Sequence, residues 1–304
     1  MLPVTLLTGI DEAFRGAVAG NASAAAGPTG VLVEYDVSRL TEGSVVRIAR
    51  AAAAELRVDA IVATVDTGSM IADLTGEQLI QDRGIPTAAQ DGRAIAEVIA
   101  RQLESANAAI LSSDDGSVRA LVLAVNPQLL VRTTPAGLLG VRLDDPAATE
   151  PGSIVAPLED DGPVRTLVWQ SDRPFHPERL YDALEDLVAG TARGWGTVWI
   201  ATQHRNRLSW DSFGTSIAIG VLGPWLADLP ADRWSTVGQQ HQARSALEWH
   251  PEHGDRASDL SITGVGLDVR ELRERLDGCV LRADEAVHPL TDPFAPYLEG
   301  RTAA

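Results

Sequence analysis

Three histidines near one another in the second half of the chain could act as metal ligands. His241, His250 and His253 fall within 13 positions, with Glu252 and Asp255 beside them. Imidazole nitrogens and carboxylate oxygens are ligands that Zn²⁺ accepts, and His250 and His253 are spaced i, i+3. One hypothesis is therefore a zinc site at the three histidines. The favoured interpretation is a polar turn with exposed histidines, because the spacing matches no familiar zinc finger.

Other catalytic constellations are weak. The chain contains no lysine, because all 25 of its Lys+Arg residues are arginine. Nucleotidases with a phosphate-binding loop place a lysine ammonium on the β- and γ-phosphates, and this chain cannot supply that group. No Ser-His-Asp or Cys-His set has a recognisable spacing. His176, in Arg-Pro-Phe-His-Pro, is either catalytic or a histidine at the entry to a helix, and the second interpretation is favoured.

Composition limits the classes of partner. The formal net charge of −17 repels phosphate backbones, so direct nucleic-acid binding is not expected. Cys279 is the only cysteine, which excludes an internal disulfide and a cysteine-based zinc site and fits a reducing cytoplasm. The first apolar run lacks a basic region before it and is predicted to be a strand, not a signal peptide. No apolar run is long enough to predict a membrane span.

The length favours two domains, and tryptophan divides the chain. All seven tryptophans lie between Trp169 and Trp249. The stretch 133–162 is rich in Pro, Gly and Asp and has little periodicity, as is typical of a linker. We therefore predict one domain over residues 1–162 and a second over residues 163–304.

The first domain alternates short apolar runs with helical stretches, which indicates an α/β fold with a parallel sheet. Arg93–Ala109 carries an apolar helical face, and a further helix is expected near Ser44–Leu56. The predicted strands are Val4–Leu7, Val31–Val33, Ala60–Val65, Ala109–Leu111 and Ala120–Val125.

The second domain is predicted to be a small α+β domain. Pro177–Ala189 has Pro at its first position and Gly190 after its end, and Asp268 is placed to cap a second helix. The predicted strands are Arg165–Trp169, Thr197–Thr202, Ser216–Leu222, Ser258–Thr263 and Cys279–Leu281. The tryptophans of this domain serve either its core or a surface that binds a partner.

Several segments together resemble the CobW-type P-loop GTPase family, in a divergent actinobacterial branch. The most specific of them is Arg173–Leu180, which resembles the entry to the CobW C-terminal domain. The similarity covers residues 165–295 well and residues 1–125 only in patches. The other segments are Leu2–Gly9, Val65–Gly76, Gln102–Leu111, Gly194–Thr202, Gly223–Trp225, Gly254–Arg256 and Asp292–Phe294.

The chain departs from this family where nucleotide would bind. The family's phosphate loop, Gly-x-x-Gly-x-Gly-Lys-Thr, corresponds here to residues 9–16, in which only the first glycine is kept. Glu12 and Phe14 replace glycines whose bare backbone would wrap phosphates. Arg15 stands at the lysine position, and Gly16 has no hydroxyl for Mg²⁺. In place of the guanine-reading Asn-Lys-x-Asp, only Asp115 could still accept a hydrogen bond from the base. The family's cysteine motif is absent.

The resemblance implies a degenerate P-loop-type α/β domain followed by a CobW-type C-terminal domain. Gly9, Arg15, Gly16 and Asp115 would be the remnants of the nucleotide site, with GTP, Mg²⁺ and Zn²⁺ as the family's ligands. The expected function is zinc homeostasis without GTP hydrolysis, through a protein partner of the C-terminal domain. That partner could be ribosome-associated, because actinobacterial relatives accompany zinc-independent ribosomal proteins. The alternative is an active GTP-dependent zinc metallochaperone with an atypical loop.

Overall fold

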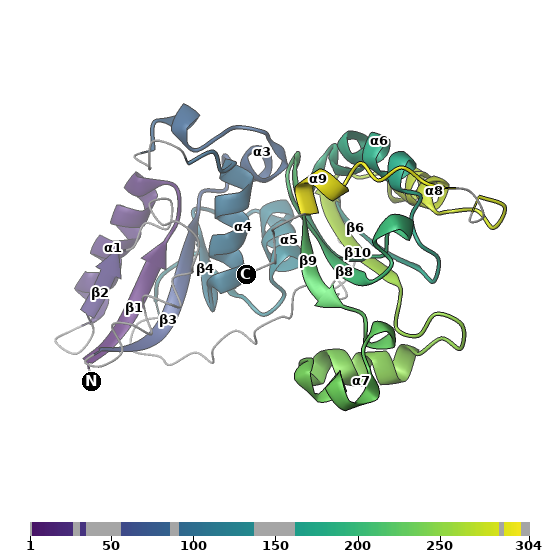
Figure 1. Cartoon of the computed structure of the whole chain (residues 1–304). Coiled ribbons are helices and arrows are strands. Elements are labelled where there is room, and N and C mark those ends of the chain that lie inside the picture. The colour runs from purple at the N-terminus through teal and green to yellow at the C-terminus, as the bar shows by residue number, and fades with distance from the viewer. Residues whose placement is uncertain are drawn as a thin grey trace. The chain divides into compact units, whose positions relative to one another are not determined.

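The chain forms two compact units in a computed structural model (Figure 1). One unit consists mainly of residues up to 148, and the other mainly of residues from 166 onwards. The structure describes residues 2–26, 31–34, 56–85, 91–136, 162–285 and 289–298. The helix predicted near Ser44–Leu56 falls outside these ranges except for its last residue, which begins a strand. Most of the predicted linker also falls outside them.

The first unit is built on a five-stranded parallel sheet in the order β2-β1-β3-β4-β5. Buried alanine and β-branched residues fill its central strands, as expected for a sheet covered on both faces. The α/β prediction is thus confirmed. The strands are β1 (Leu2–Thr8), β2 (Val31–Glu34), β3 (Leu56–Val65), β4 (Ala108–Leu111) and β5 (Leu130–Arg132).

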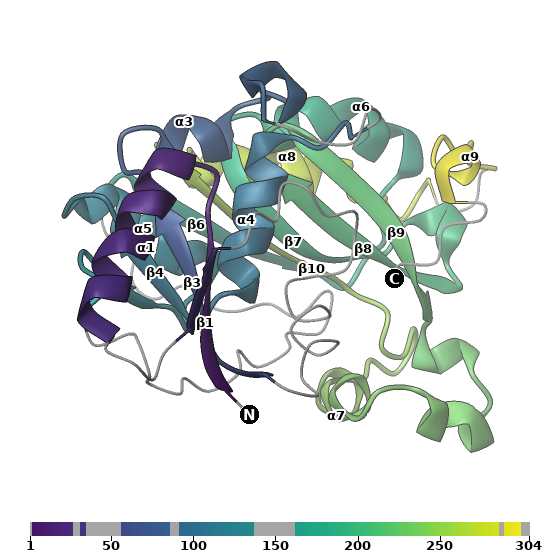
Figure 2. The same cartoon turned by 90° about the vertical axis from the view of Figure 1, so that its left-hand side faces the viewer.

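Helices lie on both faces of this sheet. The two views show α1 (Glu12–Ala26) on one face and α4 (Ile95–Ser105) with α5 (Gly116–Val125) on the other (Figures 1 and 2). The predicted apolar stripe of α4 is buried against the sheet. A short helix, α3 (Met70–Thr75), and a 3₁₀ turn, Gln81–Arg83, follow β3.

The prediction of a strand over Ala120–Val125 was wrong, because these residues form the second half of α5. Continuous apolar runs do not distinguish a buried strand from a buried helix. The helix is decided by the Asp115 carboxylate, which accepts hydrogen bonds from the first-turn backbone, and by burial of Val118, Leu121, Val122 and Val125 at helical spacing. The strand at this edge of the sheet is instead β5, which the sequence analysis missed.

The second unit contains a five-stranded sheet in the order β6-β10-β7-β8-β9, in which β7, β8 and β9 are antiparallel neighbours. Two long helices, α6 (Pro177–Val188) and α8 (Val269–Cys279), contribute Leu180, Leu187, Leu272 and Leu276 to the core. The strands are β6 (Val164–Ser171), β7 (Thr191–Val198), β8 (Asn206–Phe213), β9 (Ser216–Pro224) and β10 (Ser258–Val265). Shorter helices are Leu226–Asp228, Ala231–Thr236, α7 (Gln239–Glu248) and α9 (Ala295–Leu298).

The predicted α+β character of this unit is confirmed, with corrections to single elements. His176 and Asp268 cap α6 and α8 as local sequence indicated. The strand expected over Thr197–Thr202 runs earlier, over β7, because Gly190 ends the preceding segment at φ 70°. The strand predicted at Cys279–Leu281 does not form. Cys279 ends α8 as a buried small side chain, and Val280 makes only an isolated bridge to Phe175.

None of the helices within the described ranges is both long and apolar enough to cross a membrane.

Candidate functional site

A cleft of about 350 Å³ opens at the carboxyl edge of the parallel sheet. It is lined by residues that follow β1, such as Asp11 and Arg15, and by Asp66 after β3. After β1 the chain forms β2, which pairs with one edge of β1, and later forms β3, which pairs with the other edge of β1. Open α/β sheets bind ligands where the strand order reverses in this way. The cleft is therefore where the resemblance places a nucleotide.

The connection between β1 and α1 is too short to be a phosphate loop. Only residues 9–11 separate the two elements, because α1 already begins at Glu12. Asp11 accepts a hydrogen bond from the Phe14 backbone nitrogen at 2.7 Å and so occupies the helix N-terminus with a carboxylate. The first turn of α1 thus has its own anion, and the eight-residue loop suggested by the resemblance is mostly helix.

Arg15, the residue at the lysine position, is turned back into the protein. Its side chain is buried, and its Nη1 donates a 2.5 Å hydrogen bond to the carbonyl oxygen of Gly9. A guanidinium bound to the backbone in this way stabilises the β1–α1 connection from inside.

Gly9 has a packing role. A Cβ atom there would lie 2.0 Å from Thr64 Oγ1 on the neighbouring strand β3, closer than any real contact. Thr64 Oγ1 also donates to the carbonyl oxygen of Thr8. Gly16 lies exposed inside α1 with nothing within 4 Å of such an atom. The surviving glycines of residues 9–16 thus have unrelated roles.

Asp115 lies at the carboxyl edge of β4 and is engaged as the cap of α5. Its Oδ1 accepts from the backbone nitrogens of Ser117 and Val118 at 2.9 and 3.0 Å. The preceding Ser112 hydrogen-bonds to Thr67 and to the Asp66 carboxylate, which follow β3. The edge therefore carries a hydroxyl and carboxylate network in which the described groups bind one another.

His250 and His253 lie on a tight turn between α7 and β10. His250 and Gly254 exchange two backbone hydrogen bonds of 2.8 and 2.9 Å, which close the turn around Pro251–His253. Gly254 adopts φ 69°, and a side chain there would collide with Ala227. This turn stacks the imidazoles of His250 and His253, with ring centroids 3.8 Å apart and planes within 7°.

The structure separates His241 from the other two histidines. His241 lies on α7, is 5% exposed, and its Nε2 bonds to Asp255 Oδ2 at 3.1 Å. Asp255 also accepts from the backbone nitrogens of Leu226 and Ala227, both at 2.9 Å. Burial raises the pKa of Asp255, but the hydrogen bonds of His241, Ala227 and Leu226 outweigh this and hold the pKa below its usual range.

Arg256 also stabilises the turn that carries His250 and His253. It donates to the carbonyl oxygens of His204 and His253, at 3.0 and 2.9 Å, and pairs with Asp228 at 2.7 Å. The Gly254–Arg256 segment is thus a structural turn. Both of its charged residues fix the loop that carries His250 and His253.

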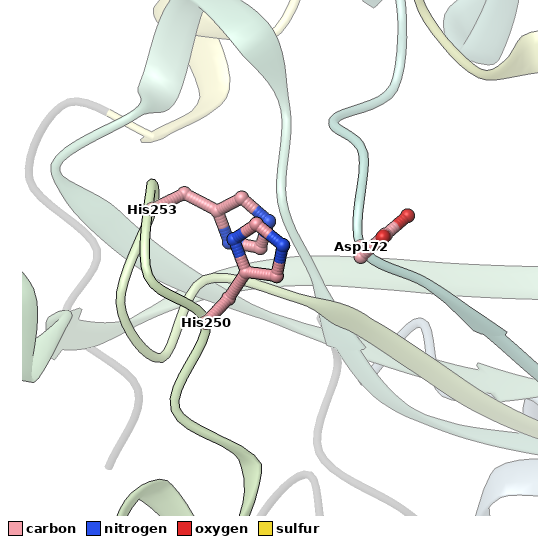
Figure 3. A group of neighbouring side chains, drawn as sticks. All are labelled: Asp172, His250 and His253. Carbon is pink, nitrogen blue, oxygen red and sulfur yellow. The ribbon is translucent and has the colours of Figure 1, made fainter.

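Asp172, which the sequence analysis did not single out, completes a group with these two histidines (Figure 3). One ligand atom from each of Asp172, His250 and His253 lies within 4.8 Å of the others. Asp172 follows β6, and each imidazole presents a ring nitrogen toward its carboxylate (Figure 3). The only signal in the sequence is the position of Asp172 beside the Arg-Pro-Phe-His-Pro segment.

The environment favours a neutral His253. Burial lowers the pKa of this imidazole and the adjacent His250 lowers it further. The indole of Trp199 packs against the ring of His253 at 5.3 Å, and Nδ1 of His253 is buried with no hydrogen-bond partner. A neutral imidazole is the form that binds a metal.

Residues 164–280 match the cobalamin synthesis protein cobW C-terminal domain. The CobW-type resemblance seen in the sequence is therefore confirmed. The matched range covers β6 through the end of α8, and includes the histidine turn.

Two curated proteins illustrate the relationship. The chain is 26% identical over 261 residues to "Zinc chaperone Rv0106" of Mycobacterium tuberculosis, covering 81% of this chain and 63% of that protein. It is 24% identical over 250 residues to "Zinc-regulated GTPase metalloprotein activator 1" of Dictyostelium discoideum, covering 74% and 52%. The chain thus spans less than two thirds of the length of these relatives.

Among solved structures, the chain is similar to the Zn(II)-bound YjiA GTPase from E. coli, with 13% identity and a TM-score of 0.40. That similarity covers 92% of this chain and 99% of the other.

Alanine substitutions should separate the two glycines of residues 9–16. Gly9→Ala should destabilise the first unit by about 1–3 kcal/mol, because its Cβ would overpack Thr64. Gly16→Ala should be neutral or stabilise by up to about 1 kcal/mol, because the site is open and helical. Urea unfolding followed by far-UV circular dichroism measures both. Equal destabilisation by the two changes would contradict the assigned roles.

Replacing Asp255 should loosen the histidine turn. Asp255→Asn places an amide against backbone N–H donors. We expect the free energy of unfolding to fall by about 2–4 kcal/mol at pH 7. Urea denaturation monitored by tryptophan fluorescence measures this change. Asp268→Asn is the matched control, because asparagine caps a helix as well as aspartate does, and it should change little.

The pH dependence of this effect follows from the depressed pKa of Asp255. The stability from its carboxylate is fully present above the pKa of the unfolded chain, about 4, and is lost as pH falls through the folded-state pKa. The difference between Asp255→Asn and the unsubstituted chain should therefore shrink on acidification. A difference that grew below pH 4 would refute this role.

Proposed function

We propose that this chain, whose residues 164–280 form a CobW C-terminal domain, serves zinc homeostasis without hydrolysing GTP and works through protein contacts. The zinc role is supported by the names of the two relatives, a zinc chaperone and a zinc-regulated activator. A cytoplasmic location is part of the proposal and is consistent with Cys279 being a buried free thiol.

The β1–α1 connection carries the proposal that GTP is not hydrolysed. Its backbone cannot encircle a phosphate, because only three residues separate the end of β1 from the start of α1. Asp11 and Glu12 add negative charge where a polyphosphate would approach, and Arg15 is committed to Gly9. Each missing charged hydrogen bond is worth about 1.5–3 kcal/mol, so two or three weaken phosphate binding by several orders of magnitude.

A GTP-dependent metallochaperone is the second candidate function. The observation that favours it is the cleft at the switch point of the parallel sheet, whose position suits a ligand. This function would require α1 to unwind at its first turn, so that Arg15 and the backbone around Glu12 could reach a phosphate.

Exposed aromatic residues of the second unit support the protein-contact part of the proposal. Trp234 and Trp249 are 38% and 42% exposed, and their rings lie 5.5 Å apart. We call these two residues the tryptophan patch. Leu247, in the last turn of α7, is 87% exposed. Clustered exposed tryptophans are typical anchors of protein interfaces.

The net charge of −17 makes ribosomal RNA an unfavourable contact, so a ribosome-associated partner would be a protein.

Calorimetric titration with GTP and Mg²⁺ tests the absence of nucleotide chemistry. We expect no binding tighter than about 10 μM and no phosphate release. The double substitution Arg15→Lys/Gly16→Thr restores the family's Lys-Thr pair, yet should also fail to bind, because the loop itself is missing. Tight binding with turnover by the unsubstituted chain would overturn the proposal in favour of the metallochaperone. Binding gained only by the double variant would show that side chains, and not the loop, are limiting.

Crosslinking in zinc-starved cells tests the protein partner. Leu247→Ser and Trp234→Ser should reduce the crosslinked species, identified by mass spectrometry, because both remove apolar surface beside or within the tryptophan patch. Tyr297→Ser, at a 60% exposed aromatic residue on α9, is the control and should leave crosslinking unchanged. Sedimentation of the same extracts through sucrose shows whether the partner travels with ribosomes. Crosslinking that all three substitutions leave intact would remove the patch from the proposal.

A further inference from the structure

The geometry points to an exchangeable zinc-binding site formed by Asp172, His250 and His253 in the CobW C-terminal domain. This inference deepens the zinc role proposed above and rests on it, since it names the site at which the chain itself would hold the metal. It differs from the three-histidine site hypothesised from the sequence, because Asp172 replaces His241.

The three side chains converge from distant parts of the chain. Asp172 comes from the end of β6, whereas His250 and His253 come from the turn before β10. Their ligand atoms nevertheless lie within 4.8 Å of one another, and the ring nitrogens face the carboxylate (Figure 3). Tetrahedral zinc with bonds of about 2.1 Å sets its ligands about 3.4 Å apart. Small side-chain rotations that open the stacked rings would close that difference.

The two ring nitrogens of each histidine have different surroundings. Nδ1 of His253 is buried with no hydrogen-bond partner, and it lies on the side of the ring away from Asp172 (Figure 3). His250 Nδ1 accepts only a 3.2 Å hydrogen bond from the Glu252 backbone nitrogen. Two parallel imidazoles also hold their lone pairs side by side. Figure 3 shows the other nitrogen of each ring, Nε2, turned toward Asp172, and a cation held there would be bound by both Nε2 atoms and the Asp172 carboxylate.

The surrounding residues hold this group in place. Trp199 backs the ring of His253, and Arg256 binds the His253 carbonyl. Asp255, through Leu226, Ala227 and His241, anchors the base of the turn. Outer residues that orient ligands in this way are a regular part of metal sites.

The ligand set identifies the metal class and its lability. Two imidazoles and one carboxylate suit Zn²⁺ and disfavour Mg²⁺ and Ca²⁺, which prefer oxygen ligands. Structural zinc sites use four protein ligands, whereas three leave a coordination position open. Asp172 is exposed and the histidines are half-buried, so that position can be reached by a ligand from a donor or acceptor protein. The site is thus built to pass zinc on.

Zinc titration of the full chain against a chromophoric zinc chelator tests the site, with no nucleotide or partner present. We expect one zinc per chain. Binding should weaken at least tenfold in Asp172→Asn and at least a hundredfold in His250→Asn/His253→Asn. His204→Asn, which removes an exposed histidine of the same domain outside the group, should bind like the unsubstituted chain. Equal binding by the unsubstituted chain and the double variant would overturn the inference, as would the absence of stoichiometric binding.

Co²⁺ provides a readout that needs no substitution. Four-coordinate Co²⁺ at a site of two histidines, one carboxylate and water gives intense visible absorption bands, whereas six-coordinate Co²⁺ on a protein surface gives weak ones. Intense bands that zinc removes support the site, and weak bands refute it. Failure of both assays would refute the zinc site. It would not affect the proposal that GTP is not hydrolysed, which the GTP titration tests separately.

Discussion

The histidine turn of the second unit depends on hydrogen bonds to the buried carboxylate of Asp255. One side chain, 2% exposed, receives hydrogen bonds from the backbone of Leu226 and Ala227 and from His241. A buried charge is tolerated only when it is fully paired, so the elements that provide these donors must meet at this point. The turn that follows α7 is therefore fixed, and with it the stacked pair His250 and His253.

The first unit uses the same principle to a different end. Its charges at the switch point are satisfied within the protein, by Arg15 on the Gly9 carbonyl and by Asp11 on the first turn of α1. A helix N-terminus and a cation, which in a nucleotidase would face a phosphate, here stabilise the fold. Burial of the central strands stabilises the parallel sheet and does not depend on the sequence of the β1–α1 connection.

Elements with strong local signals were predictable. Pro177 and Asp268 mark where α6 and α8 begin, because capping depends on neighbouring residues only. The apolar run Ala120–Val125 was not predictable, since strand and helix both bury such a run, and the cap at Asp115 decides between them. The spacing of His250 and His253 identified two of the three ligands of the candidate zinc site. Asp172 could not be added, because its place is set by the pairing of β6 within a sheet whose strands come from distant parts of the chain.

The sequence by itself determined which chemical groups are available. It has no lysine for a phosphate and no cysteine pair for zinc, and its CobW-like segments concentrate in the second half. The tertiary structure decided how the remaining groups are used. Arg15, Asp115 and His241 each became partners of the fold, whereas His250 and His253 were left facing Asp172. The physical reason is that a polar side chain can serve a ligand only when folding has not already satisfied it, and burial and backbone contacts settle that question.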